Sequence, residues 1–402
     1  MKKLIGIVFC VLLAACRQGE YPKGIQHVVV IGIDGLSSQG LREAHTPCMD
    51  SLMRNGAYSY TDRCVIPTVS KPNWHAMISG AGPEATGVVS NSWNRNQYDF
   101  PAVALTGNHT FPNIFRVIRK QMPAAELGSI YHWGDFGSIL EDDIMNLSQS
   151  CSSALGTAQQ TAQYILDRKP ALTFIQLDEV DHIGHQDGHM SPAYLQEIET
   201  TDGHVRMIVD AVQQAGIAES TLIMVVSDHG GIFRKHGDNT YEEFNTPIIF
   251  SGKGVKKNYL IRQQIYKYDV AANIAFALGL ETPQVWTGRP TRAAYEGFDE
   301  PANLWTDGID VLPPPRFRAE TYSAPNGIFT VDVPAEVHIL IPEGVEGEIR
   351  YTTDESTPTR NSTLYREPFT VDRYTVITAR LFGDKGESPQ AVAFYRVDEL
   401  GK

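Results

Sequence analysis

The chain has 402 residues, of which 42% are hydrophobic and 20% are charged, so it can bury a large core and divide into two domains. Its formal net charge is −13, which argues against nucleic acid as a standing partner, because phosphate backbones are bound by clustered Lys and Arg. An acidic protein that handles phosphate must gather positive charge locally, and bound metal ions are one way to do so.

The N-terminus has the features of a secretion signal. Residues 1–16, MKKLIGIVFCVLLAAC, combine two lysines, an apolar run too short to span a bilayer and small residues before a cysteine. The stretch Leu13-Ala14-Ala15-Cys16 resembles a bacterial lipobox, which implies that Cys16 is lipidated and becomes the mature N-terminus. The alternative is an ordinary signal peptide with an incidental cysteine. We therefore expect a bacterial lipoprotein anchored to a membrane, extracytoplasmic, in the periplasm, at the outer membrane or on the cell surface.

Three further cysteines, Cys48, Cys64 and Cys151, would then lie in an oxidising compartment. Their number is odd and no CxxC spacing is present, so a zinc site built from cysteines is not expected. One disulfide is possible, but the sequence does not assign its partners.

Four short apolar segments, at residues 27–33, 172–177, 221–227 and 246–252, are rich in β-formers. Their continuous apolar character predicts strands that are buried on both faces of a mostly parallel sheet. Helical patterns lie between and after them, at residues 154–169, 192–216 and 266–280. Strands that alternate with helices predict an α/β sandwich, which would occupy residues 25–305.

The composition changes near residues 306–318, where a Pro-Pro-Pro run predicts a stiff linker. Beyond it, residues 319–402 alternate apolar and polar positions, with turn residues between the short segments. That pattern predicts a small antiparallel β-sandwich as a second domain.

Acidic residues and histidines follow three of the predicted strands. Asp34 comes directly after 27–33, Asp228 and His229 directly after 221–227, and Asp181 and His185 shortly after 172–177. Ligands of doubly wound sheets bind beyond the carboxyl ends of the strands, so these side chains should converge on one crevice. His236, a few residues past His229, can return to the same edge.

Three aspartates and three histidines are enough to bind two divalent metal ions, and this mixture of ligands favours zinc. Two such ions about 4 Å apart can hold both the attacking and the leaving oxygen of a phosphoryl transfer. Any one of these acids alone could be an ordinary turn residue, so the prediction rests on the whole set. The chemistry that this set allows is a metal-assisted phosphoryl displacement.

Residues 68–80, TVSKPNWHAMISG, predict a helix with Ser70 just before its first turn and Pro72 within it. A helix N-terminus adds positive potential where a phosphate group would lie. Ser70 is therefore a candidate for a helix cap, for a nucleophile activated by a metal ion, or for both.

Six motifs along residues 25–300 resemble the alkaline phosphatase superfamily, and within it the type I phosphodiesterase/nucleotide pyrophosphatase branch. They are GIDGL (32–36), PTVSKPNWHAMISG (67–80), GVVSN (87–91), DHIGH (181–185), SDHG (227–230) and KHG (235–237). The resemblance implies an alkaline-phosphatase-like α/β/α sandwich as the catalytic domain and two divalent metal ions, Zn²⁺ by preference. The implied site consists of one metal set of Asp181, His185 and His236, a second of Asp34, Asp228 and His229 that Ser70 also reaches, and Asn91 as the residue that holds a phosphate oxygen.

Ser70 is the nucleophile that this resemblance implies, acting through a phosphoseryl intermediate, although the branch more often has threonine there. Sulfatases, which belong to the same superfamily, convert Cys or Ser to formylglycine within a C/S-x-P-x-R motif. Here the stretch runs Ser70-Lys71-Pro72-Asn73-Trp74, with tryptophan in place of the arginine. We therefore expect Ser70 to remain a serine and sulfatase activity to be the less favoured alternative.

The choice between monoester and diester substrates depends on the segment HWGDFG, residues 132–137. Phosphomonoesterases of the superfamily place Lys or Arg beside the transferred group, and this segment has neither. It resembles instead the aromatic segment of the diesterases, with Trp133 and Phe136 as pocket walls, unless both are core aromatics. Lys71 is a further candidate for contact with a charged substrate, although a surface lysine is the simpler interpretation.

The segment at residues 350–371 resembles the small C-terminal domain of chitobiases and related glycoside hydrolases. The resemblances together favour a phosphodiesterase or nucleotide pyrophosphatase whose substrate is a nucleotide, another small molecule, or a lipid or glycan headgroup. The alternatives are an alkaline phosphomonoesterase and a phosphoethanolamine-type transferase, and beyond them a non-catalytic glycan-binding lipoprotein. The sequence leaves the oligomeric state open.

Overall fold

The computed structural model describes residues 21–97, 99, 101–238, 240–301, 312–318, 323–324, 326–331, 334–342, 344–384 and 386–397. The predicted signal peptide with Cys16 therefore lies outside the described residues, as do residues 306–311 of the predicted linker. Within the described ranges, no helix combines the length and the apolar character that crossing a membrane requires.

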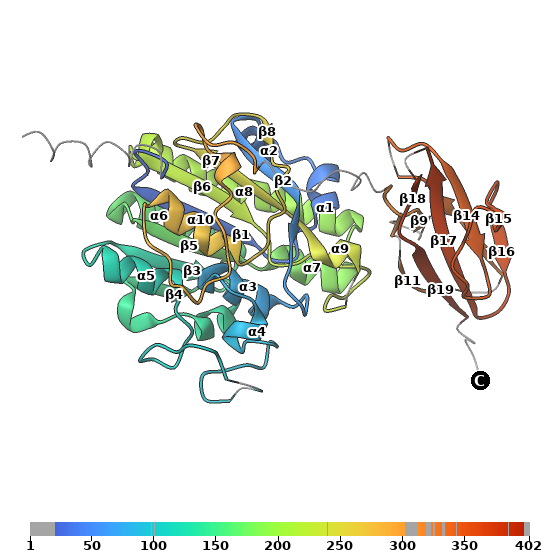
Figure 1. The fold of residues 1–402 in the computed structure, drawn as a ribbon, viewed down its shortest axis with the longest axis horizontal. Helices are drawn as coiled ribbons and strands as arrows, with labels where there is room; N and C mark the ends of the chain where they lie inside the picture. The colour runs from blue at the N-terminus through green and yellow to red at the C-terminus, as the bar shows by residue number, and fades with distance from the viewer. Residues whose placement is uncertain are drawn as a thin grey trace, which may run out of the picture.

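The larger domain is built on a mixed sheet, which in the described part of the chain has eight strands in the order β4-β3-β5-β1-β6-β7-β2-β8 (Figure 1). The pairings are parallel except those of β7 with β6 and β2, which are antiparallel. The strands are β1 His27–Ile33, β2 Gly56–Arg63, β3 Leu127–Tyr131, β4 Leu147–Ser150, β5 Leu172–Leu177, β6 Thr221–Val226, β7 Asn245–Gly252 and β8 Tyr259–Leu260. This is the mostly parallel α/β sheet that the sequence predicts.

Helices cover both faces of this sheet. The α-helices are α1 Ser38–Glu43, α2 Pro47–Arg54, α3 Ser70–Ser79, α4 Pro83–Thr86, α5 Ile114–Gln121, α6 Ala154–Arg168, α7 Glu179–Asp187, α8 Pro192–Gln214, α9 Tyr241–Phe244 and α10 Asp269–Ala277. Short 3₁₀ helices are η1 Gly134–Ile139, η2 Asp142–Ile144, η3 Ala218–Ser220 and η4 Arg292–Ala294.

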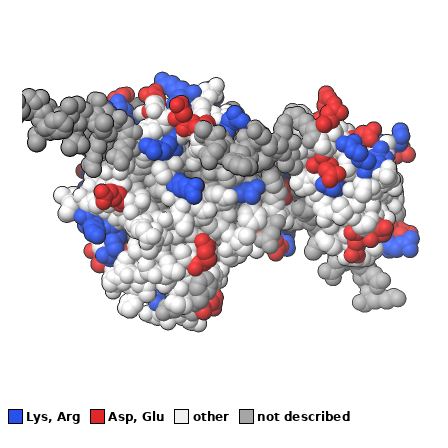
Figure 2. Space-filling view, in the orientation of Figure 1, with Lys and Arg blue, Asp and Glu red and all other residues white. Residues whose placement is uncertain are grey.

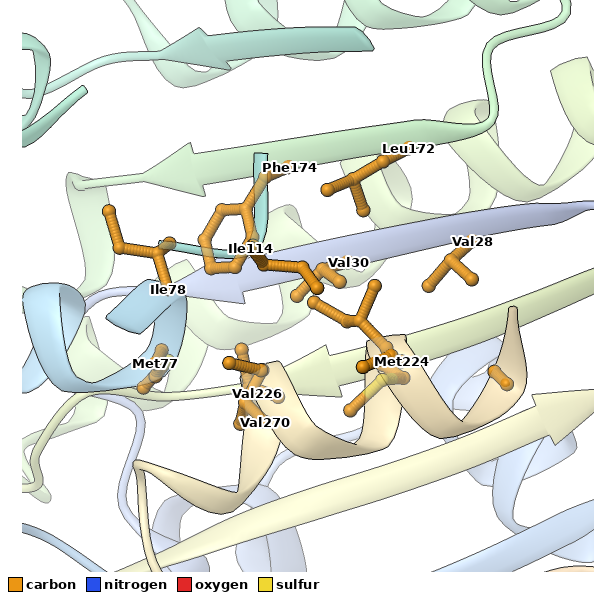
Figure 3. Packing of buried hydrophobic residues seen from close by; sticks show 14 of the residues in the cluster. Val28, Val30, Met77, Ile78, Ile114, Leu172, Phe174, Met224, Val226 and Val270 are labelled. Carbon is orange, nitrogen blue, oxygen red and sulfur yellow. The ribbon is translucent and has the colours of Figure 1, made fainter. Parts of the chain in front are cut away.

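Alternate residues of the central strands point to opposite helical layers. Val28 and Val30 of β1 join one core with α3, α5 and α10, and Figure 3 shows them beside residues of β5, β6 and these helices. Val29 and Ile31 join the other core with α2, α6 and α8. The central strand β1 is thus buried on both faces. This packing fixes the position of its carboxyl end, where Asp34 follows.

The smaller domain consists of short, mostly antiparallel strands around its own apolar cluster. Its first strand, β9, starts at Arg316, inside the range predicted as a linker. The strands are β9 Arg316–Arg318, β10 Ser323–Ala324, β11 Asn326–Val331, β12 Ala335–Val337, β13 Ile339–Leu340, β14 Glu348–Thr352, β15 Thr363–Leu364, β16 Phe369–Val371, β17 Thr375–Gly383, β18 Gly386–Glu387 and β19 Ala391–Val397. Only β11 and β19 pair in parallel among these described strands.

Charged side chains are interspersed over the face of the molecule drawn in Figure 2, and large areas of that face carry neither sign. The excess of acidic residues is therefore not gathered into one patch on this face. The cysteines Cys48, Cys64 and Cys151 are all free, so the disulfide that the sequence leaves possible does not form among them.

Candidate active site

The carboxyl ends of β5, β1 and β6 meet at one edge of the sheet, because these three strands are adjacent and parallel. Asp34 follows β1, and Asp228 and His229 follow β6, while Asp181 lies in the first turn of α7 after β5. Gly35 allows the close approach of these segments: its φ is 68°, and a Cβ there would lie 2.7 Å from the Asp181 side chain. The side chains predicted to follow these strand ends therefore converge at one edge of the sheet.

Two clusters of carboxylates and imidazoles form at this edge. In one of them His185 Nε2 lies 3.2 Å and His236 Nε2 lies 3.8 Å from Asp181 Oδ2. In the other, His229 Nε2 lies 3.5 Å from Asp34 Oδ1 and 3.1 Å from Asp228 Oδ2. Within each cluster the ligand atoms lie within 4.8 Å of one another. These are the two sets of three that the sequence resemblance implies.

The clusters differ in their access to solvent. All three side chains of the Asp34 cluster are buried, whereas in the other cluster Asp181 is buried, His236 is half-buried and His185 is exposed. The Asp34 cluster is therefore shielded from solvent, whereas the Asp181 cluster is open to solvent through His185.

The donor atoms of both clusters suit divalent metal ions. Asp34 Oδ1, Asp181 Oδ1 and Asp228 Oδ2 are buried and have no hydrogen-bond partner among the described residues, which is costly unless a cation binds them. Each imidazole directs its other nitrogen at a carbonyl: His185 Nδ1 at Arg234 O (2.9 Å) and His229 Nδ1 at Gly230 O (2.8 Å). His236 Nδ1 does the same with Thr68 O at 2.9 Å. Nε2 of each histidine is thus left for a metal ion, as in known metal sites.

The crowding of carboxylates shifts their pKa values. Burial raises the pKa of Asp228 to about 8, and the negative charge of Asp181 adds to this rise. Burial, together with Asp228 and Asp181, also raises the pKa of Asp34 well above its ordinary value. Burial opposes ionisation of Asp181 as well, but its hydrogen bond with His185 and the nearby imidazoles outweigh burial and lower its pKa. Bound cations would offset the negative charge of these crowded, buried carboxylates.

Ser70 lies next to the buried cluster. It is the first residue of α3 rather than its cap, because Val69 occupies the cap position. Its Oγ lies 3.2 Å from Nε2 of His229, and only 6% of the residue is exposed. The side chain therefore faces the candidate metal ligands instead of closing the helix end.

Asn91 is oriented by a backbone hydrogen bond. Its Oδ1 accepts from the N–H of Lys71 at 2.8 Å, which leaves the N–H groups of its amide outside this bond. The residue is exposed. Because Lys71 follows Ser70 in the chain, this contact holds Asn91 close to the start of α3.

The three pocket residues proposed from sequence lie in different surroundings. Lys71 is 3% exposed, not a surface lysine, and its Nζ donates to Trp93 O at 3.0 Å and lies 3.8 Å from Asp135 Oδ2. Trp133 is half-buried, with its ring 5.9 Å from Lys71 Nζ. Phe136 is fully buried against Trp74, so it is the core aromatic that the sequence left as an alternative.

Sequence reasoning missed two residues that hold Asp34. Trp74 Nε1 donates to Asp34 Oδ2 at 3.0 Å, and Gln176 Nε2 donates to the same oxygen at 2.9 Å. Trp74 stands one helical turn after Ser70, which is the sequence signal for its place near the site. Nothing in the local sequence singles out Gln176.

His189 is not among the predicted metal ligands, but it lies beside them. Its ring is 1% exposed, has no hydrogen-bond partner among the described residues, and places Nε2 3.8 Å from Asp181 Oδ1. Burial lowers its pKa to about 4, so the ring is neutral. Two glycines enclose it, since a Cβ on Gly184 or Gly231 would lie 2.5 Å or 2.2 Å from ring atoms.

Comparisons with known proteins agree with this geometry. The chain is 23% identical over 241 residues to ectonucleotide pyrophosphatase/phosphodiesterase family member 3 of Rattus norvegicus, covering 54% of this chain and 26% of that protein. It is 24% identical over 308 residues to GPI ethanolamine phosphate transferase 1 of Saccharomyces cerevisiae, covering 68% of this chain and 33% of that protein. The chain thus spans about a quarter to a third of these relatives.

Solved structures share the fold at low identity. Murine ectonucleotide pyrophosphatase/phosphodiesterase 5, an inactive Thr-to-Ala variant in complex with AMP, superposes with a TM-score of 0.53 at 15% identity, covering 64% of this chain and 96% of that one. A 2-O GAG sulfatase superposes with a TM-score of 0.55 at 13% identity, covering 90% of this chain and 81% of that one.

Two families match different parts of the sequence. Residues 325–393 match the chitobiase/beta-hexosaminidase C-terminal domain. Residues 28–121 and 128–268, more than half of the chain, match the type I phosphodiesterase/nucleotide pyrophosphatase family and include both candidate metal clusters and Ser70. The chain therefore belongs to the type I phosphodiesterase/nucleotide pyrophosphatase family.

Proposed function

We propose that this protein is a metal-dependent phosphodiesterase, similar to nucleotide pyrophosphatases, with Ser70 as its nucleophile. The observation that carries the proposal is the position of Ser70 Oγ, 3.2 Å from Nε2 of His229, at the edge of two carboxylate–imidazole clusters. The family membership supports hydrolysis of a phosphoester bond.

Two divalent ions, Zn²⁺ by preference, would be held by Asp181, His185 and His236 and by Asp34, Asp228 and His229. When bound, such ions lower the pKa of a hydroxyl and stabilise negative charge on phosphate oxygens. The unpartnered carboxylate oxygens described above support this assignment.

The chain's own residues then divide the reaction between them. Ser70 Oγ forms a bond to phosphorus while the bond from phosphorus to the leaving oxygen breaks. The proton that the serine hydroxyl loses ends on the leaving group, which departs as an alcohol and leaves a phosphoseryl intermediate. Water then cleaves the phosphoseryl bond and restores the serine hydroxyl. Asn91 donates an amide N–H to a non-bridging phosphate oxygen, because its carbonyl oxygen is already used by Lys71 N–H. The buried start of α3 keeps bulk water away from Ser70.

A diester substrate is supported by the charges near the site. The segment 132–137 has no Lys or Arg. Lys71 follows Ser70 in the chain, but Asp135 Oδ2 lies 3.8 Å from its Nζ, so the pair adds little net positive charge for a dianionic monoester. The AMP complex of the murine relative supports a nucleotide as one class of substrate.

Three chromogenic substrates test the proposal: bis-p-nitrophenyl phosphate, p-nitrophenyl phosphate and p-nitrophenyl sulfate, each with zinc-loaded full-length protein. We expect the diester to have the highest kcat/KM and the sulfate to be a poor substrate. A preference for the monoester of more than about a hundredfold, roughly 2.7 kcal/mol in transition-state binding, would refute the diesterase assignment.

A phosphoethanolamine-type transferase is the second candidate, because the yeast transferase aligns with 68% of this chain. Such an enzyme would pass the group on Ser70 to an acceptor alcohol instead of to water. Adding an alcohol such as glycerol or a glycan to the diester assay separates the two. A phosphorylated acceptor that forms faster than free phosphomonoester would favour the transferase.

We also propose that Cys16 carries a lipid anchor that places the enzyme outside the cytoplasm, on the strength of the lipobox-like sequence. In cells that express the full chain, Cys16→Ser should abolish labelling by a radioactive fatty acid and move the protein from the membrane to the soluble fraction. Unchanged labelling would show that another residue, or none, is lipidated.

A further inference from the structure

The loop between β6 and α9 carries two candidate metal ligands, His229 and His236. Between them lies Phe233, whose φ of 55° is in the left-handed region that residues other than glycine seldom adopt. A backbone conformation of this kind persists only where the surrounding contacts fix it. The contacts of Phe233 therefore help to fix the shape of this loop.

The backbone beside Phe233 supports the open metal cluster directly. The Arg234 carbonyl accepts the hydrogen bond from His185 Nδ1 at 2.9 Å, and so orients that imidazole. The Phe233 carbonyl accepts from the backbone N–H of His189 at 2.5 Å, at the end of the helix that carries Asp181 and His185. A shift at Phe233 would therefore move the partner of one metal ligand and the chain segment that carries another, His236.

The side chain of Phe233 packs on the smaller domain. It is half-buried and lies against the apolar cluster of that domain, which includes Leu312, Phe317 and Val337. An aromatic ring from the metal-binding loop thus contributes to the core of the C-terminal domain.

Charged side chains of the two domains also influence each other. Glu242 of α9 is near Arg316 of β9, and each shifts the pKa of the other toward its charged form, against the effect of burial. Glu43 of α1 acts on Arg316 in the same way. In Figure 1, α1, α7 and α9 lie on the side of the larger domain that faces the C-terminal strands.

We propose that the C-terminal domain is a structural part of the metal centre, which it stabilises through Phe233. Phe233 is a positioning residue: its ring, held by the C-terminal domain, fixes the loop that carries His236 and orients His185. Docking of the domain thereby increases the affinity of the Asp181–His185–His236 cluster for a divalent ion. The inference rests on the proposed metal site, but it does not depend on which phosphate ester is the substrate.

Zinc affinity of the full-length protein tests this without substrate. Metal-free protein is titrated with Zn²⁺ in competition with a chromogenic chelator, which resolves two binding steps. We expect Phe233→Ala to weaken one step about tenfold or more and to leave the other within about twofold. Phe233→Tyr, which keeps the ring, should match the wild type. Tyr374→Ala serves as a matched control, because Tyr374 is a 59% exposed aromatic of the same C-terminal domain.

Hydrogen exchange of the metal-free protein provides a second, independent readout. Amides of residues 230–238 should exchange faster in Phe233→Ala than in the wild type, while amides of β1 and β6 should not. If Phe233→Ala does not fold, Phe233→Leu takes its place and should show a smaller loss in the same binding step.

Three results would overturn the inference: both zinc affinities unchanged in a folded Phe233→Ala protein, both weakened equally, or unchanged exchange in the loop. A protein that binds zinc as expected but hydrolyses no phosphate ester would refute the proposed function and leave this inference intact. A wild-type protein that binds no divalent metal would refute both.

Discussion

Ser70 combines burial with a hydroxyl placed against a candidate metal ligand, His229, at 3.2 Å. Ser70→Ala removes the oxygen but no metal ligand other than that hydroxyl, so the zinc content should stay near that of the wild type. Turnover should fall by about a thousandfold or more, because the nucleophile is lost.

Ser79→Ala is the control for Ser70, since Ser79 lies in the same helix and donates to the His75 carbonyl at 2.6 Å, away from the clusters. It should retain activity. Substantial activity in Ser70→Ala would remove Ser70 from the mechanism.

Trp74 and Asp34 provide a test of how the buried cluster is held. Trp74→Phe keeps an aromatic ring but deletes the N–H that donates to Asp34 Oδ2 at 3.0 Å. We expect the affinity of the Asp34–Asp228–His229 cluster for zinc to fall by about 10- to 100-fold, as when hydrogen bonds to metal ligands are removed elsewhere. The measurement is the same chelator competition.

Trp286 offers a matched control, because its buried indole N–H donates to the Pro112 carbonyl at 2.8 Å, away from the metal clusters. Trp286→Phe should cost stability without changing the affinity for zinc. Equal zinc affinity in both variants would show that the Trp74 hydrogen bond does not support Asp34.

The candidate metal ligands could be proposed from sequence because Asp34, Asp228 and Asp181 follow recognisable strands, which places them and their histidine neighbours at a known edge of the sheet. Residues that support the ligands could not. Trp74 lies 40 residues from Asp34, and Gln176 lies 142 residues from it, so only the folded chain shows these contacts. His189 has no sequence signal beyond its position near His185.

Among the secondary-structure elements, β2 contains a buried ion pair with the segment before α10. Asp62 and Lys267 are both fully buried, with Lys267 Nζ 2.5 Å from Asp62 Oδ2 and hydrogen-bonded to Thr246 as well. Lys267→Met should leave the Asp62 carboxylate buried without a partner and destabilise the protein by about 3–5 kcal/mol in urea unfolding.

The double variant Asp62→Leu with Lys267→Met separates loss of packing from loss of charge pairing. Because it leaves no unpaired charge, it should regain most of the stability lost in the single variant. A double variant as unstable as Lys267→Met would mean that shape, not charge, accounts for the loss.

Strands could be predicted from sequence where every residue is buried and apolar. They could not be predicted where polar residues or glycines interrupt the apolar run. Strands β1 and β5 match the predicted bounds, because every one of their positions after His27 is buried and apolar or small, apart from Thr173 and Gln176. The predictions omitted β2, β3 and β4, whose polar and glycine positions break the apolar run. The antiparallel direction of β7 depends on its pairing with neighbouring strands, which the local sequence does not show. Helix α10 begins at Asp269 rather than at residue 266, because the Asp269 side chain accepts a hydrogen bond from the Tyr266 N–H and forms a turn there.

At the scale of the whole molecule, Glu242 near Arg316 predicts how stability depends on pH. Burial raises the pKa of Glu242 to about 7; the charge of Arg316 opposes this rise and Glu243 adds to it. Between the ordinary value of 4.5 and about 7, the folded protein binds a proton that the unfolded chain has released. The contribution of Glu242 to stability is therefore full below about pH 4.5 and is lost as the pH rises through about 7.

The measurement is the Tm of metal-free protein between pH 5 and pH 8. Glu242→Gln should show a smaller fall in Tm over this interval than the wild type. Glu219→Gln, at an exposed position, should follow the wild-type curve. Parallel curves for the wild type and Glu242→Gln would contradict the predicted burial of this carboxylate.

The boundary between the two domains could be predicted only in part. Composition indicates where the apolar alternation of the second domain begins, but the strand that starts at Arg316 lies within the Pro-rich range read as a linker. The contact of Phe233 with the second domain depends on three-dimensional packing that neither segment encodes alone.

The enclosure of His189 by Gly184 and Gly231 has a consequence for how this family can vary. The His189 ring occupies the space that a side chain at residue 184 or residue 231 would need. The three positions therefore cannot change independently. Among related chains, alanine at either glycine position should occur only where residue 189 is smaller than histidine. An alignment would then show correlated substitutions at residues 184, 189 and 231. They would arise from packing around Asp181, although none of the three residues binds metal in the proposed site.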